Sequence, residues 1–429
     1  MRTDPGPLQG RRILVAASGS IAAVKTPLLV SALVKAGAEV RCLITPSASQ
    51  LVSAVALASL SRHRCYQDQD QWDPQQPRPL HVALAEWAEL VIVAPLSATT
   101  LARWSQGLGE GLLASLLLAC DCPVIAAAAM NTGMWRHPAV RRNWELLGED
   151  PRVLRLAPES GLLACDRVGD GRMAAPELIH LAAESALQRC TEDGLLPLDW
   201  EGRRLLVSAG PTVEGLDPAR VLSNRSSGRM GVLIAQAARF RGAVVDLVHG
   251  PLQVPSAWLD GLCCHAVESS GAMQEQLQCL QAQADGVVMA AAVADWRRRG
   301  GAAMDKAPKA DLQAMLASAL EPVPDLLMGL QATRPPSQLI LGFAALSGTD
   351  AQIIDRARQK CSAKGCDLLM ANPIDREGQG FGSANNGGWL VSAEGGVDVM
   401  PVSGKLALAH VLLDRMLKRW SSVESSAEA

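Results

Sequence analysis

The chain begins the same structural pattern twice, and this repetition is the feature that most constrains its fold. Gln9–Val15 reads QGRRILV and is followed by the small residues Ala16–Gly19, while Glu201–Val207 reads EGRRLLV and is followed by Ser208–Gly210. An apolar run that enters a small-residue loop before a helical pattern is typical of the first strand of a parallel α/β sheet. A chain of 429 residues is long enough for two such domains. We therefore predict an α/β protein with two doubly wound, Rossmann-like domains.

Composition places the chain among soluble globular proteins. Hydrophobic residues make up 48% of the chain, charged residues 19%, and the net charge is −3. This charge gives no electrostatic attraction to nucleic acid or to an anionic membrane, and an aromatic content of 3% argues against a base-stacking surface. The eleven cysteines show no CxxC spacing and no disulfide framework, and no apolar signal-like run precedes Ile13. We therefore expect reduced thiols in a cytoplasmic protein.

One apolar stretch, residues 111–130, is long enough to be considered as a transmembrane helix. Asp121 and Pro123 divide it. We instead predict a helix over Leu112–Ala119 and a short buried strand over Val124–Ala127, and no membrane association.

The first half is predicted to form a doubly wound domain. Apolar runs at Ile13–Ala17 and Leu90–Ala94 predict buried parallel strands, and Pro176–Arg189 predicts the last helix. The loop after the first run lacks the GxGxxG pattern, so it either binds a phosphate or another anion or is a plain tight turn. Residues 190–201 have a polar, Pro- and Gly-containing composition that indicates a boundary. The predicted domains are residues 1–190 and 191–429.

Polar residues follow several of the predicted strands of this half, where doubly wound folds bind their ligands. Ser97–Thr100 places hydroxyl groups at a helix start, where they cap backbone N–H groups or bind a phosphate. Asn131 follows the strand near residue 127. Both positions are candidates for ligand contacts.

Ser160–Met173, with the sequence SGLLACDRVGDGRM, contains three glycines. It is predicted to be a mobile flap, since this glycine content argues against a regular element. Its Cys165 is either reactive, with Arg167 or Arg172 favouring the thiolate, or an incidental surface cysteine.

Taken in order, these motifs resemble the flavin-dependent cysteine decarboxylases, and among them the phosphopantothenoylcysteine decarboxylases of coenzyme A biosynthesis. The matching stretches are SGSIAAVK from Ser18, His81, APLSATT from Ala94, AMNTGM from Ala129 and the flap from Ser160. The resemblance implies a flavodoxin-like flavoprotein domain that binds FMN. Ser20, Ala128 and Asp166-Arg167 depart from the family pattern, at positions peripheral to the implied chemistry.

The resemblance also implies a role for each matching residue. His81 acts in the oxidative decarboxylation, Asn131 grips the substrate carboxylate, and Cys165 protonates the enethiol intermediate. Oxidising the substrate thiol to a thioaldehyde supplies the electron sink that a cysteine carboxylate lacks, which explains the need for a flavin. The implied FMN contacts are Ser18, Gly19, Ser20, Ile21, Thr45, Ser97, Ala98, Thr99, Thr100 and Ala129, and Met130 and Arg172 are implied substrate contacts.

The second half repeats the α/β pattern. Strands are predicted at Val244–Val248 and Gly286–Ala291, and helices at Met230–Arg241 and Lys405–Trp420. A polar loop is expected after Thr212, a loop over residues 378–388, and a disordered tail over residues 421–429. Lys360 and Lys364 lie one helical turn apart, which fits either a solvated basic face or a triphosphate with magnesium.

The motifs of this half resemble the phosphopantothenate–cysteine ligases, which in bacteria are commonly fused behind the decarboxylase. The matching stretches are SAGPT, LDPAR, LSNRSSGRMG, AAAVADW, the Lys306–Lys309 loop, GFAA and the pair Lys360 and Lys364. The resemblance implies a reaction in which 4′-phosphopantothenate attacks CTP, with Mg²⁺, to form an acyl-cytidylate. The amine of cysteine then displaces CMP.

Asn224 and Lys306 are the implied catalytic residues of the ligase half. Asn224 also has a structural interpretation, because asparagine tolerates the left-handed backbone of a turn. Val323 and Leu346 depart from the family pattern and leave nucleotide affinity and choice open. The implied substrate and nucleotide contacts are Met289, Ala290, Ala291, Asp295, Lys309, Pro324, Asp325, Phe343, Lys360 and Lys364.

The leading hypothesis is a bifunctional enzyme that makes 4′-phosphopantetheine from 4′-phosphopantothenate, cysteine and CTP. The resemblance further implies a homo-oligomer, a dodecamer. One alternative is a non-catalytic flavin-binding regulatory protein, which the presence of His81, Asn131 and Cys165 disfavours. The other is a nicotinamide-dependent oxidoreductase, which the missing GxGxxG pattern disfavours. No metal ligands are identified.

Overall fold

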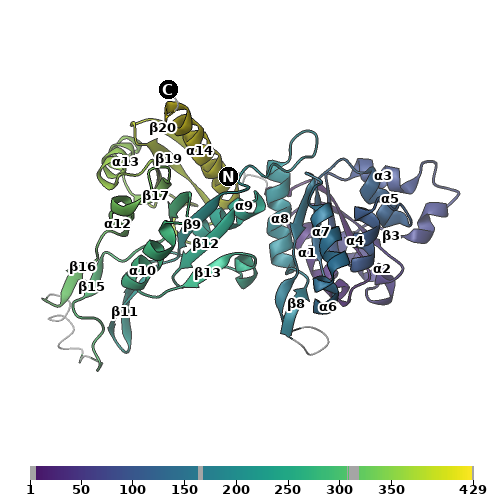
Figure 1. Cartoon of the computed structure of the whole chain (residues 1–429), viewed down its shortest axis with the longest axis horizontal. Helices are drawn as coiled ribbons and strands as arrows, with labels where there is room; N and C mark the ends of the chain where they lie inside the picture. Colours follow the sequence, from purple (N-terminus) through teal and green to yellow (C-terminus); the bar gives the residue numbers. More distant parts are fainter. Residues whose placement is uncertain (1–5, 163–167, 307, 309–317, 428–429) are drawn as a thin grey trace. The chain divides into compact units, whose positions relative to one another are not determined.

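A computed structural model describes residues 6–162, 168–306, 308 and 318–427 of the chain (Figure 1). The chain divides into two compact units. The first comprises residues 1–198 and 256–261, and the second comprises residues 199–255 and 262–429.

The first unit is built on a six-stranded parallel sheet with the strand order β3-β2-β1-β4-β5-β6. The order steps outward in both directions from the pair β1 and β4, so the doubly wound topology is as predicted and its switch point lies between these strands. The strands are β1 (Arg12–Ala17), β2 (Glu39–Ile44), β3 (Cys65–Gln67), β4 (Leu90–Leu96), β5 (Val124–Ala128) and β6 (Val153–Leu156).

The helices of the first unit alternate with these strands along the chain. Every residue of β4 is buried, as expected of a central strand covered on both faces. The 3₁₀ helices are η1 (Ile21–Lys25), η2 (Ala48–Gln50) and η3 (Asp68–Trp72). The α-helices are α1 (Thr26–Lys35), α2 (Ala54–Ser61), α3 (Leu80–Trp87), α4 (Ala98–Ser105), α5 (Leu112–Ala119), α6 (Thr132–Arg136), α7 (Pro138–Leu147) and α8 (Pro176–Arg189).

The second unit is built on an eight-stranded sheet with the order β13-β12-β9-β14-β17-β18-β19-β20. The first six strands are parallel to one another, and β19 and β20 each pair antiparallel with the strand before them. The strand order places the switch point between β9 and β14. The strands are β9 (Arg204–Ala209), β12 (Val244–His249), β13 (Cys263–Ala266), β14 (Gly286–Met289), β17 (Leu339–Leu346), β18 (Leu368–Pro373), β19 (Asn385–Ser392) and β20 (Val397–Gly404).

Helices and two small hairpins complete the second unit. The hairpins pair β10 (Val213–Asp217) with β11 (Arg220–Ser223) and β15 (Trp296–Arg298) with β16 (Leu320–Pro322). The helices are α9 (Arg229–Phe240), α10 (Ser270–Gln281), α12 (Leu326–Thr333), α13 (Asp350–Lys364) and α14 (Lys405–Ala427), with the 3₁₀ helix η4 (Ser256–Leu259) grouped with the first unit.

The apolar stretch over residues 111–130 folds as predicted into a short helix and a buried strand. Helix α5 spans eight residues, and all five residues of β5 are buried. In the described part of the chain, no helix combines the length and the apolar character needed to cross a bilayer.

The prediction that glycines keep the flap irregular is wrong for its described residues. Strands β7 (Glu159–Leu162) and β8 (Val168–Arg172) form an antiparallel ribbon in which Gly161 pairs with Gly169. A Cβ at Gly161 would lie 2.4 Å from the Arg172 guanidinium, and a Cβ at Gly169 would lie 2.5 Å from Thr132 Oγ1. The glycines therefore allow close packing of the ribbon rather than preventing it. Cys165 and Arg167 lie outside the described residues.

Three further loop predictions need correction. The segment after Thr212 contains the β10–β11 hairpin, and residues 385–388 already belong to strand β19. The predicted tail continues helix α14 as far as Ala427. The Ser421 hydroxyl donates a hydrogen bond to the Leu417 carbonyl 3.3 Å away, so this polar side chain is accommodated within the helix.

A buried arginine joins the beginning and the end of the second unit. The Arg241 side chain is 2% exposed and donates two 2.7 Å hydrogen bonds to the Asp199 carboxylate and one of 2.7 Å to the Asp414 carboxylate. Nearby, the Trp200 and Trp420 rings meet edge to face with their centroids 5.2 Å apart. These contacts hold α14 against the segment that leads into β9.

Replacing Arg241 with Met should destabilise the second unit by about 2–3 kcal/mol. This is less than the ~3–5 kcal/mol cost of breaking a fully buried pair, because the side chains of Asp199 and Asp414 are 31% and 44% exposed. Scanning calorimetry of the full chain would measure the change in the unfolding transition. Arg225→Met, at an exposed arginine of the same unit, is the matched control and should change stability by less than about 0.5 kcal/mol. Equal effects of both substitutions would contradict the prediction.

Candidate active sites

The first candidate site is a cleft of about 460 Å³ at the carboxyl ends of β1, β4 and β5. Its lining contains eight residues that the sequence singled out as FMN or substrate contacts, together with Asn131. The lining contains Lys25 and Arg172 but no acidic residue, so the charge of the cleft favours an anion. The eight are Gly19, Ser20, Ile21, Ser97, Ala98, Ala129, Met130 and Arg172.

Two loops of this cleft are tied together by one buried hydroxyl. Ser18 Oγ donates to the Pro95 carbonyl at 2.8 Å and accepts from the Ser97 backbone N–H at 2.7 Å. Ser18 is fully buried, which suits this bridging contact. Ser97 Oγ in turn accepts from the Thr100 N–H at 3.4 Å and caps α4, so the capping interpretation of these hydroxyls is confirmed for Ser97.

Gly19 lies where the loop after β1 passes close to the loop after β2. A Cβ at Gly19 would lie 2.6 Å from the Ser47 Cβ, closer than two carbons can approach without a shift. Ser20 then caps η1 by accepting a 3.5 Å hydrogen bond from the Ala22 N–H. The loop therefore presents its backbone to the cleft with little side-chain obstruction.

Asn131 caps the short helix α6 at the same cleft. Its Oδ1 accepts a 2.8 Å hydrogen bond from the Gly133 N–H, and the residue is exposed. Arg172 at the end of β8 lines the cleft as well. The amide and the guanidinium thus face one space from elements that are separated in the sequence.

Some of the predicted residues of the first half do not line this cleft. His81 lies in the first turn of α3, and Thr45, Thr99 and Thr100 are also absent from the lining. Thr45 nevertheless adjoins β1, since its N–H donates to the Ala17 carbonyl at 3.1 Å. Cys165 lies outside the described residues.

The second candidate site is a cleft of about 600 Å³ at the carboxyl ends of β9, β14, β17 and β18. It gathers residues that are spread over more than a hundred positions of the sequence. Those that the sequence predicted are Asn224, Met289, Ala290, Ala291, Asp295, Pro324, Asp325, Phe343, Lys360 and Lys364.

Asn224 is held against the loop that follows β14. Its Nδ2 donates to the Ala292 carbonyl at 3.1 Å and to the Val293 carbonyl at 3.0 Å. Among the described residues other than glycine, only Arg62 has a positive φ, so the interpretation of Asn224 as a left-handed turn residue is wrong. The amide fixes two loops at the edge of the cleft instead.

The two lysines of α13 differ in their surroundings. Lys364 Nζ lies 3.1 Å from the Asp325 carboxylate, whose other oxygen caps α12 by accepting from the Leu327 and Met328 N–H groups. Burial opposes ionisation of Asp325, but the Lys364 contact and these N–H groups outweigh it and lower its pKa. Lys360 is exposed at the same cleft. The solvated-face interpretation therefore does not describe Lys364, which is part of an ion pair.

The loop before α9 packs closely against the loop after β9, because both loops contain glycine at the contact. Gly228 has a φ of 74°, and a Cβ there would lie 3.1 Å from the Gly210 backbone. A Cβ at Gly231, one turn later, would lie 2.7 Å from the Ser208 carbonyl oxygen. Small residues thus bring the start of α9 against β9, so that the Ser226–Gly228 backbone lines the cleft.

Sequence reasoning missed Lys405, the first residue of α14. It is 5% exposed, lines the second cleft and donates a 3.2 Å hydrogen bond to the Gly380 carbonyl. Burial, with a smaller effect of the nearby Arg229, lowers its pKa to about 8. Nothing local in the sequence distinguishes this lysine from a solvated one at a helix start.

Lys306 is not among the residues that line the second cleft. The residue is exposed, and Lys309 lies outside the described residues. Of the two departures from the ligase pattern, Val323 lines the cleft, whereas Leu346 is 6% exposed and packs in the core.

Comparison with known proteins accounts for both halves. Residues 1–185 match the Flavoprotein family, and residues 200–419 match the DNA/pantothenate metabolism flavoprotein C-terminal domain. The coenzyme A biosynthesis bifunctional protein CoaBC of Bacillus subtilis is 35% identical over 413 residues, which cover 95% of this chain and 97% of that protein. The same protein of Escherichia coli K12 is 34% identical over 419 residues, which cover 96% and 98%. The chain belongs to this bifunctional family.

The family membership confirms the fold class and the enzyme type expected from the sequence. The chain combines a flavoprotein decarboxylase half with a ligase half of coenzyme A biosynthesis, and the regulatory and nicotinamide-dependent alternatives are not favoured.

Two solved structures are also similar to parts of the chain. A PPC decarboxylase cysteine mutant complexed with pantothenoylaminoethenethiol is 34% identical, covers 41% of this chain and 97% of its own, and has a TM-score of 0.38. The C-terminal domain of a CoaBC protein is 29% identical, covers 52% of this chain and 98% of its own, and has a TM-score of 0.42.

Gly19→Ala should lower the flavin content of the purified protein about tenfold. The added Cβ displaces the loop after β1, and overpacking of this kind costs about 1–3 kcal/mol, where ~1.4 kcal/mol corresponds to a tenfold change in binding. Flavin absorbance per chain after gel filtration is the measurement. Gly109→Ala is the control, since its Cβ would meet its neighbours at an ordinary 3.7 Å. Full flavin content in both variants would show that the loop does not depend on Gly19.

Proposed function

We propose that the first cleft holds FMN and 4′-phosphopantothenoylcysteine, and that the second holds CTP with Mg²⁺, 4′-phosphopantothenate and cysteine. The ligase half forms the amide and the decarboxylase half converts the product into 4′-phosphopantetheine. The observation that carries this proposal is the second cleft, where Asn224, the β14 loop and the lysines of α13 line one space although they are far apart in the sequence.

The residues of the first cleft fit a flavin phosphate. The backbone near Gly19, where a Cβ would collide with Ser47, meets the start of α4, and the lining carries cations without acids. When bound there, FMN would supply the oxidation of the substrate thiol that makes loss of CO₂ possible. The chain's part is to bind and orient the substrate beside the flavin.

Asn131 and Arg172 are suited to the substrate carboxylate. The Asn131 Oδ1 is engaged by the Gly133 N–H, which orients the amide, so its Nδ2 is the group that would donate to a carboxylate oxygen. Arg172 supplies a positive charge at the same cleft. His81 and Cys165 complete the proposed catalytic set, with Cys165 protonating the enethiol.

Cys165→Ser should release CO₂ but fail to form the reduced thiol product. A hydroxyl is a far weaker acid than a thiol, so it cannot protonate the enethiol at a useful rate. Mass spectrometry of the reaction mixture would find the oxidised, decarboxylated intermediate.

Cys190→Ser provides the control, since Cys190 lies after α8 and does not line the cleft. It should turn over as the unsubstituted enzyme does. Normal formation of 4′-phosphopantetheine by Cys165→Ser would remove this cysteine from the mechanism.

The charges of the second cleft suit a nucleotide triphosphate. Lys360 is exposed to the cleft, and Lys364 is oriented by Asp325, so both ammonium groups are available to phosphate oxygens from one helix face. The Ser226–Gly228 segment before α9 contributes backbone groups to the same lining. We place the acyl-cytidylate chemistry beside Asn224, and Mg²⁺ with the phosphates of CTP.

A nucleotide panel with 4′-phosphopantothenate and cysteine should give product with CTP and little with ATP, GTP or UTP. Lys360→Met should lower the CTP-dependent rate at subsaturating nucleotide by about tenfold or more, because a hydrogen bond to a charged group is worth about 1.5–3 kcal/mol. Ligated product measured by liquid chromatography is the readout.

Lys418→Met, an exposed lysine of α14 outside the cleft, is the matched control and should be neutral. Product with another nucleotide but not with CTP would overturn the CTP assignment and make Val323, which lines the cleft, the residue to examine. For the whole chain we propose a homo-oligomer, a dodecamer by family resemblance, which analytical ultracentrifugation would test.

A further inference from the structure

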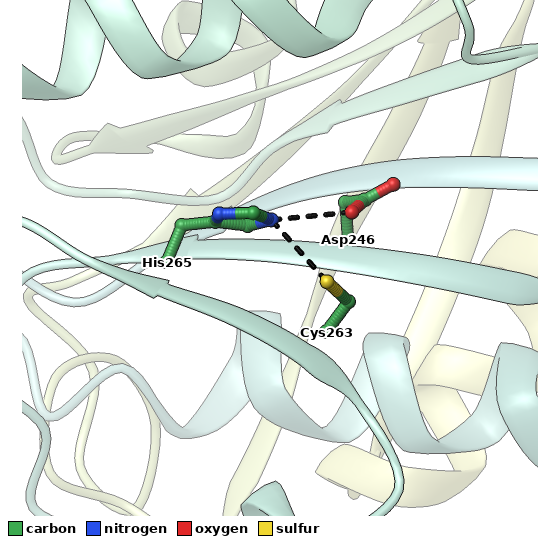
Figure 2. A group of neighbouring side chains, drawn as sticks. All are labelled: Asp246, Cys263 and His265. Carbon is green, nitrogen blue, oxygen red and sulfur yellow. Dashed lines mark hydrogen bonds and ion pairs between the residues drawn. The ribbon is translucent and has the colours of Figure 1, made fainter.

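Three side chains with metal-binding atoms meet at the edge of the second unit's sheet (Figure 2). Asp246 lies on β12, and its register partner on the edge strand β13 is Cys263. His265 follows two residues later, so it projects from the same face of β13 as Cys263. None of the three lines either candidate active site.

The Asp246 carboxylate and the Cys263 thiol both lie close to one ring nitrogen of His265. His265 Nε2 lies 3.2 Å from Asp246 Oδ1 and 3.5 Å from Cys263 Sγ, and all three atoms lie within 4.8 Å of one another (Figure 2). In a tetrahedral zinc site, bonds of about 2.0–2.1 Å to nitrogen and oxygen and about 2.3 Å to sulfur separate nitrogen from sulfur by roughly 3.5 Å and nitrogen from oxygen by roughly 3.3 Å. The two distances to His265 Nε2 therefore match those between zinc ligands, and Asp246 Oδ1 and Cys263 Sγ lie within 4.8 Å of each other.

Neighbouring groups orient two of these side chains. Asp246 is 3% exposed, and its second oxygen, Oδ2, accepts a 2.7 Å hydrogen bond from Arg204 Nε, which leaves Oδ1 directed at the histidine. Gln276 Nε2 contacts the other ring nitrogen, His265 Nδ1, at 3.1 Å, and a flip of the amide would place the Gln276 oxygen there instead. With its amide turned so that oxygen accepts from Nδ1–H, Gln276 would hold His265 in the tautomer that offers Nε2 to a metal.

We propose that Asp246, Cys263 and His265 bind one Zn²⁺ through Oδ1, Sγ and Nε2, with water as the fourth ligand on the exposed side of Cys263. The set of one nitrogen, one sulfur and one oxygen suits zinc and does not suit Mg²⁺ or Ca²⁺, which prefer oxygen ligands alone. Arg204 on the non-ligating oxygen is an outer partner that fixes the carboxylate. Neutral His265 keeps its ring proton on Nδ1 and binds through the lone pair of Nε2, so the bound ion displaces only the proton of the Cys263 thiol.

The proposed ion has a structural role. Strand β13 has four residues and lies at the sheet edge, where one side of the strand lacks a hydrogen-bonded neighbour. A metal that joins β13 to the buried Asp246 of β12 would hold this edge strand in register. Because zinc binds the thiolate form of a cysteine, metal binding would release the proton of the Cys263 thiol.

The test uses the full-length protein, stripped with a chelator and titrated with ZnCl₂ against a chromophoric competitor. Each chain is expected to bind one equivalent of Zn²⁺ tightly. Cys263→Ser and His265→Asn should each weaken this equivalent at least tenfold. Cys264→Ser is the matched control, because it changes the neighbouring cysteine on the opposite face of β13 and should retain full binding. CoCl₂ should add tetrahedral d–d bands in the red, beyond the absorption of the flavin, in the unsubstituted chain and in Cys264→Ser alone.

A second measurement guards against variants that fail to fold. Zinc should protect Cys263, but not Cys264, from iodoacetamide in the unsubstituted protein, with the modified residue located by tandem mass spectrometry. The proposal is overturned if the unsubstituted chain binds no zinc, if Cys264→Ser loses binding as Cys263→Ser does, or if zinc leaves alkylation of Cys263 unchanged. In those cases the triad is a hydrogen-bonded cluster in which His265 donates to Asp246.

Discussion

Both candidate active sites of this chain depend on the switch point of a parallel sheet. Connections on either side of it leave in opposite directions, so the loops at the carboxyl ends of β1 and β4, and of β9 and β14, diverge and leave a space open. In each unit a buried serine on the first strand or just after it spans this point. Ser18 Oγ accepts from the Ser97 N–H at 2.7 Å, and Ser208 Oγ accepts from the Ala291 N–H at 3.1 Å. The repeated sequence at Gln9 and Glu201 thus marks a shared framework, above which the two clefts have different linings.

The regular elements were accessible from sequence because their signals are local. Helices α5 and α8 have the predicted bounds, and β1 and β12 follow from apolar runs between turn residues. The glycine-rich ribbon was missed because glycine gives the same local signal in a loop and in a tightly packed strand, and only the partner side chain, Arg172, distinguishes them. The end of α14 was missed because a serine-rich segment does not reveal that its hydroxyls bond back to the helix.

The residues of the candidate sites could be predicted from the sequence only in part, for a different reason. Asn224 and Lys360 could be named from motifs, but their common cleft follows from strand order, which no short motif contains. Lys405 has no motif, and its low pKa arises from burial by elements distant in sequence. The zinc triad likewise escapes a search for paired cysteines, because its third ligand, Asp246, comes from the neighbouring strand. His81 and Lys306 remain proposals that rest on resemblance.

The contact between Trp200 and Trp420 has a consequence for how the chain is made. Trp200 is fully buried, and the Trp420 ring of α14 covers part of it. Trp420 Nε1 also donates a 3.2 Å hydrogen bond to the Ser337 carbonyl. On the ribosome, the first unit can close while synthesis continues, since its elements are nearly all complete by α8. The second unit must wait with its leading tryptophan uncovered until the final helix has emerged. The ligase core is therefore completed only after α14 has been synthesised, long after the first unit could have folded.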